Sequence, residues 1–513
     1  ANQGKSLKTL SHLVPNLFIP DYGSHLTSAF YIRGVGSRIN APAVGMYVDN
    51  IPYLDKSAFD FNFMDVERVD VMRGPQGTLY GRNAMGGIVR VFTKNPFHYR
   101  GTEVKMGYAT GDNNRNVTVS HHHRLNDSFA FSAGGYYVGS DGFFKNDLTG
   151  KKVDGIQTVG GRLRGIYKAN DRLTMDLSLN YDYCDEGAYP YYYAGSLTEK
   201  EPYADYVGKI SNNNESRYRR NMLNTGLNIS YDLGEVEIRS VTSFQNLCDR
   251  MFQDQDFLPL DIYTMEQRQR INTLTEEVTA RSKYGAIWNW VGGLNVTKQW
   301  LRTEGPVTFG KDGVAMLEQN INSVLPENPP MSINFREENL RMGGIFETPM
   351  LNLGVFHQSV FNITKALSLT AGIRLDYEKN SINYDTSSSV DYGFSMPSMH
   401  VDFQDLTANI TEYDGKINRD RFNVLPKVAL KYDFDANNNV YMSVARGMRS
   451  GGYNIQMFSD LLQGAMQKKM MDGVKEATFA YLDKNMPMMA DKIKMMISAV
   501  MPKVELSGVE TVA

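Results

Sequence analysis

The side chains best suited to chemistry in this sequence are three adjacent histidines. His121, His122 and His123 could ligate a metal ion or a haem iron. On an extended strand, successive side chains point to opposite faces, so three neighbours cannot converge on one ion. We therefore expect no metal site and no cofactor here, and we interpret the histidines as residues at the rim of a sheet.

Two cysteines, Cys184 and Cys248, are the only other candidates for metal or redox chemistry. Two are too few for a disulfide scaffold or a cysteine-ligated zinc protein. Both follow strands that should run in the same direction, about two strand spacings or roughly 10 Å apart. The sequence therefore leaves open the possibility that Cys184 and Cys248 form a disulfide that tethers two loops.

No motif indicates catalysis. There is no Ser-His-Asp order, nucleophile elbow, paired-carboxylate motif or zinc-protease motif. Residues 34–36 read Gly-Val-Gly, which lacks the third glycine of a dinucleotide fingerprint, and no P-loop lysine follows. The 54 basic and 57 acidic residues nearly cancel, so no basic surface for nucleic acid is expected. We predict neither an enzyme nor a nucleic-acid-binding protein.

The elements that must position these residues are strands. From about residue 101 onward, apolar and polar residues alternate with period two, and residues 173–183 show the pattern with one face of Leu, Met and Tyr. Strands are expected near 101–109, 115–123, 128–138, 158–168, 172–183, 219–231, 235–247, 269–283, 286–299, 353–363, 367–380, 420–433 and 440–449. A soluble sandwich would also alternate, so the periodicity alone leaves sandwich and membrane barrel open.

The lengths of the connections favour the barrel. From the second strand on, short turns and long loops alternate, as in outer-membrane barrels with tight turns on the periplasmic side. No stretch approaches the 18 apolar residues of a spanning helix, so any span must be a closed sheet. Tyrosines would form two girdles, Tyr181, Tyr183 and Tyr377 at the outer rim and Tyr231 and Tyr432 at the inner rim.

Residues 1–97 differ, with short strand-like runs separated by glycine-rich turns. Residues 65–94 read DVERVDVMRGPQGTLYGRNAMGGIVRVFTK, which closely resembles the plug signature of TonB-dependent outer-membrane receptors. Residues 31–36 and 43–53 resemble the earlier plug boxes in the expected order, and 443–454 is similar to a recurring barrel segment. The positions that carry the plug resemblance are Gly34, Arg68, Gly74, Pro75, Gly77, Tyr80, Gly81, Gly86 and Gly87.

The resemblance implies a mainly β fold, with a globular α/β plug followed by an antiparallel transmembrane β-barrel of about 22 strands. We assign residues 1–97 to an N-terminally incomplete plug, 98–455 to part of the barrel and 456–513 to an extracellular loop segment with Met-rich helices. The odd strand number and the end of the sequence without a final amphipathic strand lead us to expect an incomplete barrel. The Met-rich helices could pack on neighbouring loops or offer an adaptable surface to a ligand.

The resemblance also suggests contacts between plug and barrel. In the family, arginines of two plug boxes face acidic groups on the barrel wall, and Arg33 and Arg73 match their positions. Residues 275–281 resemble the barrel segment that supplies such a carboxylate, and alternation places Glu277 on the lumen side. A pair between Glu277 and Arg281 within the barrel is the alternative.

The function implied by the resemblance is active uptake across the outer membrane of a Gram-negative bacterium. The ligand would be scarce, most often an iron–siderophore complex and less often haem, cobalamin or a glycan, and a TonB-type periplasmic partner would supply the energy. The predicted ligand-facing apices of the plug are Arg38, Asn40, Tyr53, Asp55 and Lys56. A receptor fragment without transport activity remains an alternative, whereas the plug signature argues against a passive porin or an adhesion barrel.

Overall fold

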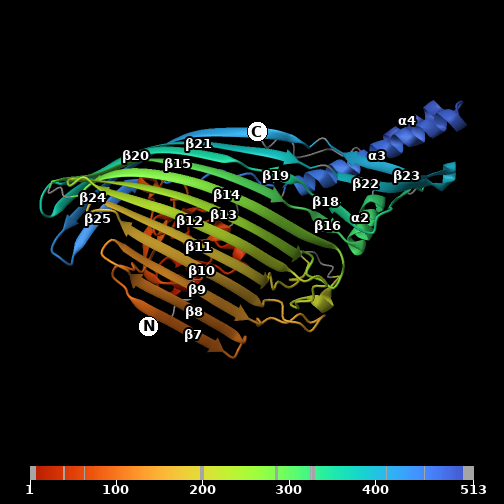
Figure 1. Cartoon of the computed structure of the whole chain (residues 1–513). Coiled ribbons are helices and arrows are strands. Elements are labelled where there is room, and N and C mark those ends of the chain that lie inside the picture. The colour runs from red at the N-terminus through yellow and green to blue at the C-terminus, as the bar shows by residue number, and fades with distance from the viewer. Residues whose placement is uncertain are drawn as a thin grey trace.

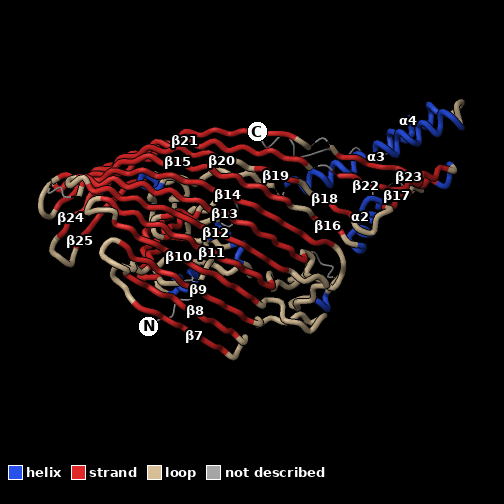
Figure 2. Tube along the Cα trace, viewed as in Figure 1, coloured by secondary structure: helices blue, strands red, loops and turns tan. Residues whose placement is uncertain are grey.

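The computed structural model describes residues 7–500, except 38–40, 63, 197–201, 284–286, 324, 326–329, 387, 412 and 456. A large curved sheet wraps around a smaller N-terminal domain that lies in its hollow (Figure 1). Most of the chain is strand, and helices gather at one end (Figure 2). Among the described helices, none is long and apolar enough to cross a membrane.

The N-terminal domain is built on a four-stranded sheet in the order β4-β3-β6-β5. Its elements are η1 (Leu7–His12), β1 (Leu17–Phe18), η2 (His25–Thr27), β2 (Tyr31–Ile32), β3 (Val44–Val48), β4 (Ile51–Tyr53), η3 (Lys56–Ala58), β5 (Val66–Arg73), α1 (Gly77–Tyr80) and β6 (Gly87–Thr93). Val44, Met46 and Val89 are fully buried in its core, which continues into Leu247 and Ile271 of the large sheet. The domain is therefore packed against the sheet through shared apolar contacts as well as polar ones.

The large sheet contains all thirteen strands that the alternation predicts, each antiparallel to its neighbours. They are β7 (Gly101–Ala109), β8 (Asn114–Arg124), β9 (Phe129–Ser140), β10 (Ile156–Lys168), β11 (Leu173–Gly187), β12 (Arg217–Asp232), β13 (Val236–Asp254), β14 (Tyr263–Ser282), β15 (Trp288–Glu304), β20 (Met350–Asn362), β21 (Leu367–Asp385), β24 (Gly415–Asp433) and β25 (Asn439–Ala445). Within the described residues, β7 and β25 form the two ends of this sheet.

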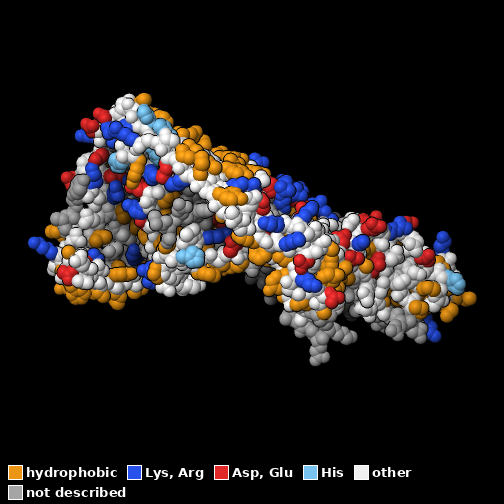
Figure 3. Space-filling model, turned by 90° about the horizontal axis from the view of Figure 1, so that it is seen from below, with side chains coloured by type: hydrophobic (Ala, Val, Ile, Leu, Met, Phe, Trp, Pro, Cys, Tyr) orange, Lys and Arg blue, Asp and Glu red, His pale blue; other side chains and the backbone are white. Residues whose placement is uncertain are grey.

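The two faces of the large sheet differ in polarity as predicted. On β11, Leu177 is 54% exposed on the outer face, whereas Ser178 and Asp182 point inward and are buried. Hydrophobic side chains gather along the outer sides of the curved part and charged ones in its hollow (Figure 3). In a sandwich, the apolar face would instead be covered by a second sheet. The alternation therefore belongs to a barrel wall.

One end of the sheet carries an additional folded part, which we call the end extension. It comprises β16 (Val307–Phe309), α2 (Lys311–Ser323), β17 (Ser332–Phe335), β18 (Leu340–Met342), β19 (Ile345–Glu347), β22 (Ser388–Met396), η5 (Pro397–Met399), β23 (Val401–Ile410), α3 (Met457–Asn485) and α4 (Ala490–Val500); η4 (Ala204–Tyr206) lies in another loop. The separate sheet β17-β22-β23 was not predicted. Met466 and Met470 of α3 are buried against Phe394 of this sheet.

Candidate functional site

A cavity of about 500 Å³ lies between the N-terminal domain and the inner face of the large sheet. Asp55, Lys56 and Arg82 line it from the N-terminal domain. The sheet contributes mainly amides and hydroxyls, namely Gln253, Gln267, Gln269, Gln299, Thr303 and Asn380, together with Met251, Met265 and Met350. The segment 450–455, which follows β25, lines another side. A molecule in this cavity would touch both parts of the protein at once.

Arg82 is the most distinctive polar group of the cavity. Its Nη1 donates a weak hydrogen bond to Met350 Sδ at 3.2 Å, and its Nε is buried without a hydrogen-bond partner among the described residues. Burial lowers the pKa of Arg82 although Glu378 and Asp376 oppose the shift. Because an unpaired buried donor is costly, a ligand oxygen that accepted from Arg82 would be bound favourably.

Some of the residues predicted as ligand-facing apices line the cavity, and Tyr53 does not. Asp55 and Lys56 line it, and Asp55 caps η3 by accepting from the backbone N–H of Ser57 at 2.9 Å. Tyr53 lies below the surface, buried and stacked on Phe61 with ring centroids 5.5 Å apart. The other two predicted positions, Arg38 and Asn40, lie outside the described residues.

The glycine-rich signature forms a turn that docks on the wall at β20, β21 and β24. Thr78 Oγ1 donates to Leu425 O at 3.2 Å. A Cβ at Gly77 would lie 2.7 Å from Arg446 O, and one at Gly81 would lie 2.6 Å from the Arg374 guanidinium. Gly81 also has a φ of 67°, which favours glycine. The signature therefore selects glycine where backbone must approach the wall closely.

The other signature residues shape the N-terminal domain itself. Gly74 N donates to Gly86 O at 3.0 Å and closes the loop between β5 and β6. Tyr80 packs edge-on against Tyr47, with ring centroids 5.1 Å apart. The remaining signature positions are Gly34 and Gly87 with positive φ, Pro75 in the loop before α1, and Arg68, which pairs with Asp70 and lies over Phe92.

A second set of contacts to the wall is ionic. Arg220 of β12 is fully buried and donates to Ser57 O at 2.5 Å, to Asp60 O at 2.8 Å and to Asp182 Oδ1 at 2.5 Å. Asp49 of the N-terminal domain pairs with Arg162 of β10. On the N-terminal side the partners are thus carboxylates and carbonyls, and on the sheet side they are arginines.

Among these contacts, the Asp49 carboxylate has both hydrogen-bond donors and arginine partners. It accepts from Thr93 N at 2.9 Å and from Thr93 Oγ1 at 2.8 Å, and Arg164 lies 3.9 Å away. Burial alone would raise the pKa of Asp49, but the Arg162 and Arg164 guanidiniums and the Thr93 N–H outweigh it and hold this pKa below its usual value. The carboxylate is therefore charged while the domain is seated.

Two family models match the chain, one described as TonB-dependent receptor plug domain over residues 1–88 and one as TonB-dependent receptor-like β-barrel over residues 163–467. The chain belongs to the TonB-dependent receptor family. The N-terminal domain is its plug and the large sheet is part of its barrel. Members of this family are receptors and transporters in the outer membrane of Gram-negative bacteria.

Individual relatives agree with this assignment. The pesticin receptor of Yersinia pestis is 24% identical over 454 residues, which cover 87% of this chain and 58% of the relative. The ferric yersiniabactin uptake receptor FyuA from Yersinia pestis has the same fold, with a TM-score of 0.67, 20% identity and coverage of 88% of this chain and 63% of that chain. The ferripyoverdine receptor of Pseudomonas aeruginosa follows at a TM-score of 0.56 and 14% identity, covering 87% and 55%. The chain thus spans about 58% of the length of the pesticin receptor.

The predicted contact of plug arginines with Glu277 takes a different form in the structure. Arg33 and Arg73 are exposed, and the structure brings neither to a carboxylate among the residues it describes. Arg73 ends the edge strand β5 of the plug sheet, and its Nη1 donates instead to Pro15 O at 3.3 Å. Glu277 lies inward on β14, and the charges that act on it most are Arg374, Arg239 and the plug residue Arg90.

Glu277 and Arg281 are not paired either, because Arg281 binds Glu237 at 2.7 Å. The ionic contacts that do form were missed by sequence reasoning. Arg162 and Arg220 occupy inward positions of their strands. Charged residues on the inward-facing, polar positions of the alternation are therefore the sequence feature that could have predicted these contacts.

The three histidines divide between the two faces of the sheet as expected. His122 points inward and lies 3.7 Å from Asp65, whereas His121 and His123 stack on each other on the other face.

The two cysteines are free and lie on opposite faces of the sheet. Cys184 points inward and is fully buried, whereas Cys248 has the outward phase of β13, where its neighbours Leu247 and Asp249 are buried. Side chains on opposite faces cannot bond, so the disulfide left open by the sequence does not form in this structure.

Proposed function

We propose that this receptor binds a ferric siderophore complex in the cavity above Arg82 and passes it inward across the outer membrane when a TonB-type protein acts on the plug. The names of relatives support this ligand class: FyuA takes up ferric yersiniabactin, Fiu imports ferric catecholates and a third structure holds ferripyoverdine. A vitamin B12 transporter of Vibrio vulnificus matches a shorter stretch, at 32% identity over 116 residues.

The observation that carries the proposal is the position of the cavity. Its lining comes from the plug and from the barrel wall, so any shift of the plug changes one side of the site while the other stays fixed. Its size falls within the range of about 300–1,000 Å³ that small-molecule sites occupy. Binding and release can therefore be coupled to plug movement without a further element.

The lining also suits a metal chelate with polar donors and an apolar periphery. Arg82 offers a buried N–H that has no partner in the described part of the chain, and the glutamines of the wall offer both donors and acceptors. Three methionines, Met251, Met265 and Met350, provide an adaptable apolar surface. A ligand with negatively charged oxygens on one side and rings on the other would satisfy both halves of the cavity.

Binding is tested on the full chain in detergent micelles, with ferric yersiniabactin, ferripyoverdine, a ferric catecholate and cyanocobalamin as probes. We expect calorimetry to show saturable binding of one ferric complex and no binding of its iron-free form at the same concentration. Arg82→Gln should weaken that binding about tenfold or more, because it removes a charge-assisted hydrogen bond. Arg68→Gln is the matched control, since Arg68 is exposed and pairs with Asp70 away from the cavity.

Selective binding of cyanocobalamin, or an equal effect of the two arginine variants, would contradict the siderophore proposal. Transport is tested separately, in receptor-deficient cells that produce the full chain and grow on the bound ferric complex as sole iron source. Growth should require an intact TonB system. Binding without TonB-dependent growth would leave the ligand assignment standing and overturn uptake by this chain.

A further inference from the structure

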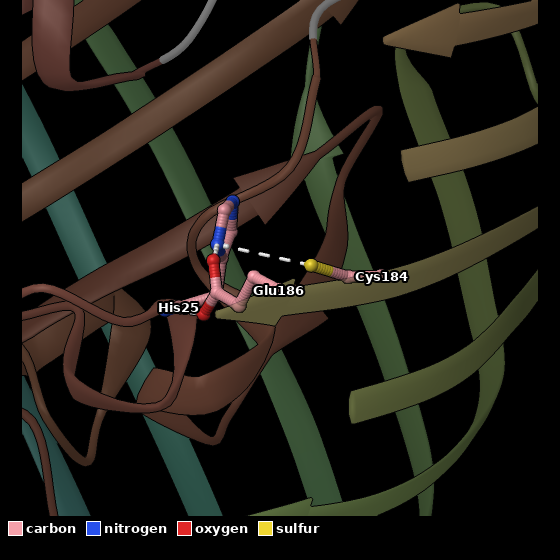
Figure 4. Close-up of side chains that lie close together, drawn as sticks. All are labelled: His25, Cys184 and Glu186. Carbon is pink, nitrogen blue, oxygen red and sulfur yellow. Dashed lines mark hydrogen bonds and ion pairs between the residues drawn. The ribbon is translucent and has the colours of Figure 1, made fainter. Parts of the chain in front are cut away.

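Three potential metal ligands meet where the plug touches β11, and none of the three is among the residues that line the cavity. His25 comes from η2 of the plug, and Cys184 and Glu186 come from the inward face of β11 (Figure 4). His25 Nδ1 lies 2.6 Å from Glu186 Oε2 and 3.8 Å from Cys184 Sγ. The three ligand atoms all lie within 4.8 Å of one another. We propose that His25, Cys184 and Glu186 bind one Zn²⁺-class divalent cation, which joins the plug to the barrel wall.

The surroundings hold Glu186 and His25 in a binding orientation. Glu186 Oε1 accepts from Ser24 Oγ at 3.0 Å and from His25 N at 2.7 Å, which leaves Oε2 turned toward the cluster. The other imidazole nitrogen, His25 Nε2, faces Asp60 Oδ2 at 3.7 Å, and Lys8 Nζ holds that carboxylate at 3.0 Å. A carboxylate behind a ligating histidine fixes the ring and makes the ligating nitrogen more basic.

The spacing is close to that of a tetrahedral zinc site. With Zn–N near 2.0 Å and Zn–S near 2.3 Å, adjacent nitrogen and sulfur ligands lie about 3.5 Å apart. The observed 3.8 Å between His25 Nδ1 and Cys184 Sγ fits this value. The distance from His25 Nδ1 to Glu186 Oε2 is that of a hydrogen bond and would open by less than about 1 Å once a cation replaced the shared proton.

The charge balance also favours a divalent cation. A cation of charge two would meet one thiolate and one carboxylate, and binding would release the thiol proton of Cys184 and the proton between His25 and Glu186. Sulfur, imidazole and carboxylate ligands together suit Zn²⁺ better than Ca²⁺ or Mg²⁺, which prefer oxygen ligands alone. A water molecule would complete the tetrahedron.

Such a cation would act as a removable link. His25 lies in the plug and the other two ligands lie in the barrel, so the cation can bind fully only while the plug is seated. By mass action, a cation that binds the seated state alone stabilises that state. This consequence does not depend on which ligand enters the cavity.

The test uses Co²⁺ as a spectroscopic probe on the full chain in detergent micelles. We expect one Co²⁺ per chain, with a sulfur-to-cobalt charge-transfer band and intense visible bands of a tetrahedral site. Cys184→Ser should abolish the charge-transfer band, and Glu186→Gln should weaken Co²⁺ binding at least tenfold. Cys248→Ser is the matched control and should leave the spectrum unchanged, because Cys248 has the outward phase on its strand.

A second readout guards against a variant that folds poorly. Added Zn²⁺ should raise the melting temperature of the wild-type chain and of Cys248→Ser, a chelator should reverse the shift, and Cys184→Ser should melt at one temperature with or without Zn²⁺. The absence of a charge-transfer band in the wild type would overturn the proposal and leave an ion pair only. The same band in Cys184→Ser would overturn it as well.

Discussion

The plug contacts the barrel through two faces that are held by different physics. On what we call the ionic face, the Asp49 carboxylate and the backbone carbonyls of Ser57 and Asp60 meet Arg162 of β10 and Arg220 of β12. On the glycine face, α1 and the residues around it approach β20, β21, β24 and the residue after β25 so closely that a Cβ at Gly77 would clash with the carbonyl of Arg446. One face depends on charge and the other on shape.

The difference has a consequence for a plug that must move. Charged groups are hydrated again when they separate. The contacts of the ionic face are therefore favourable while the plug is seated, and their loss is partly offset by hydration when the plug leaves. Close packing has no such compensation, but it fixes the position of the plug because any displacement loses many contacts together. The ionic face should therefore respond to charge and pH, and the glycine face to added volume alone.

The largest effect should follow from breaking the ionic face at Arg220. Arg220→Met leaves the buried Asp182 carboxylate without its arginine partner, and it leaves Ser57 O and Asp60 O without their donor. We expect a loss of about 3–5 kcal/mol in the free energy of unfolding, the usual result of removing one partner of a buried pair. Thermal unfolding in micelles and protease cleavage of the plug would report it.

Arg217→Met is the control on the same strand. Arg217 pairs with Asp185 at 2.7 Å but is half exposed, so its loss should change stability by about 0–1 kcal/mol. Equal destabilisation by both variants would show that β12 tolerates no change at all, and the ionic face would lose its special role.

A smaller effect should come from adding one methyl group to the glycine face. A Cβ at Gly77 would lie 2.7 Å from Arg446 O, so Gly77→Ala must push the plug from the wall. We expect a loss of about 1–3 kcal/mol in the free energy of unfolding, typical of overpacking. Gly305→Ala is the control, since nothing lies within 4 Å of a Cβ there and neither glycine has a positive φ. A Gly77→Ala variant as stable as Gly305→Ala would contradict close docking at α1.

The two faces also differ in how much of them can be predicted from the sequence alone. The alternation of β11 predicted which of its residues point inward, because a strand has a fixed period of two. It could not predict that Arg220 would meet carbonyls of Ser57 and Asp60, about 160 positions earlier, because that pairing depends on how the plug is seated. The family resemblance predicts Asp55 and Lys56 as ligand-facing residues of the plug, and both line the cavity; that they contact a ligand stays a prediction.

The end extension was only half predicted. Its helical composition predicted helices between 458 and 501, and α3 and α4 lie there. Where β22 and β23 form, the barrel topology predicts only an ordinary loop between β21 and β24. Their partners, β17 and α3, come from other parts of the chain, and only the assembled core with Phe394 and Met466 explains why the segment folds.

The smallest effect, and the one that separates the two faces most directly, should be their response to acid. Arg162 and Arg164 hold the pKa of Asp49 below its usual value although burial opposes them. A lowered pKa means that this carboxylate stabilises the seated plug above its ordinary pKa, and that the contribution is lost as the pH falls through the lowered value.

The stability difference between wild type and Asp49→Asn should therefore be present at pH 7. It should begin to shrink below the ordinary Asp pKa of about 4 and continue to shrink as the pH falls through the lowered pKa of Asp49. The deficit of Gly77→Ala should be the same at both pH values, since a steric contact does not titrate. Asp205→Asn, in the exposed helix η4, controls for the loss of one negative charge and should match the wild type at both. Melting curves of the four proteins at pH 7 and pH 3 give the comparison. If the gap of Asp49→Asn did not shrink at all between pH 7 and pH 3, the contribution of Asp49 would lie in its shape and hydrogen bonds, and the distinction between a charge-held face and a shape-held face would fail.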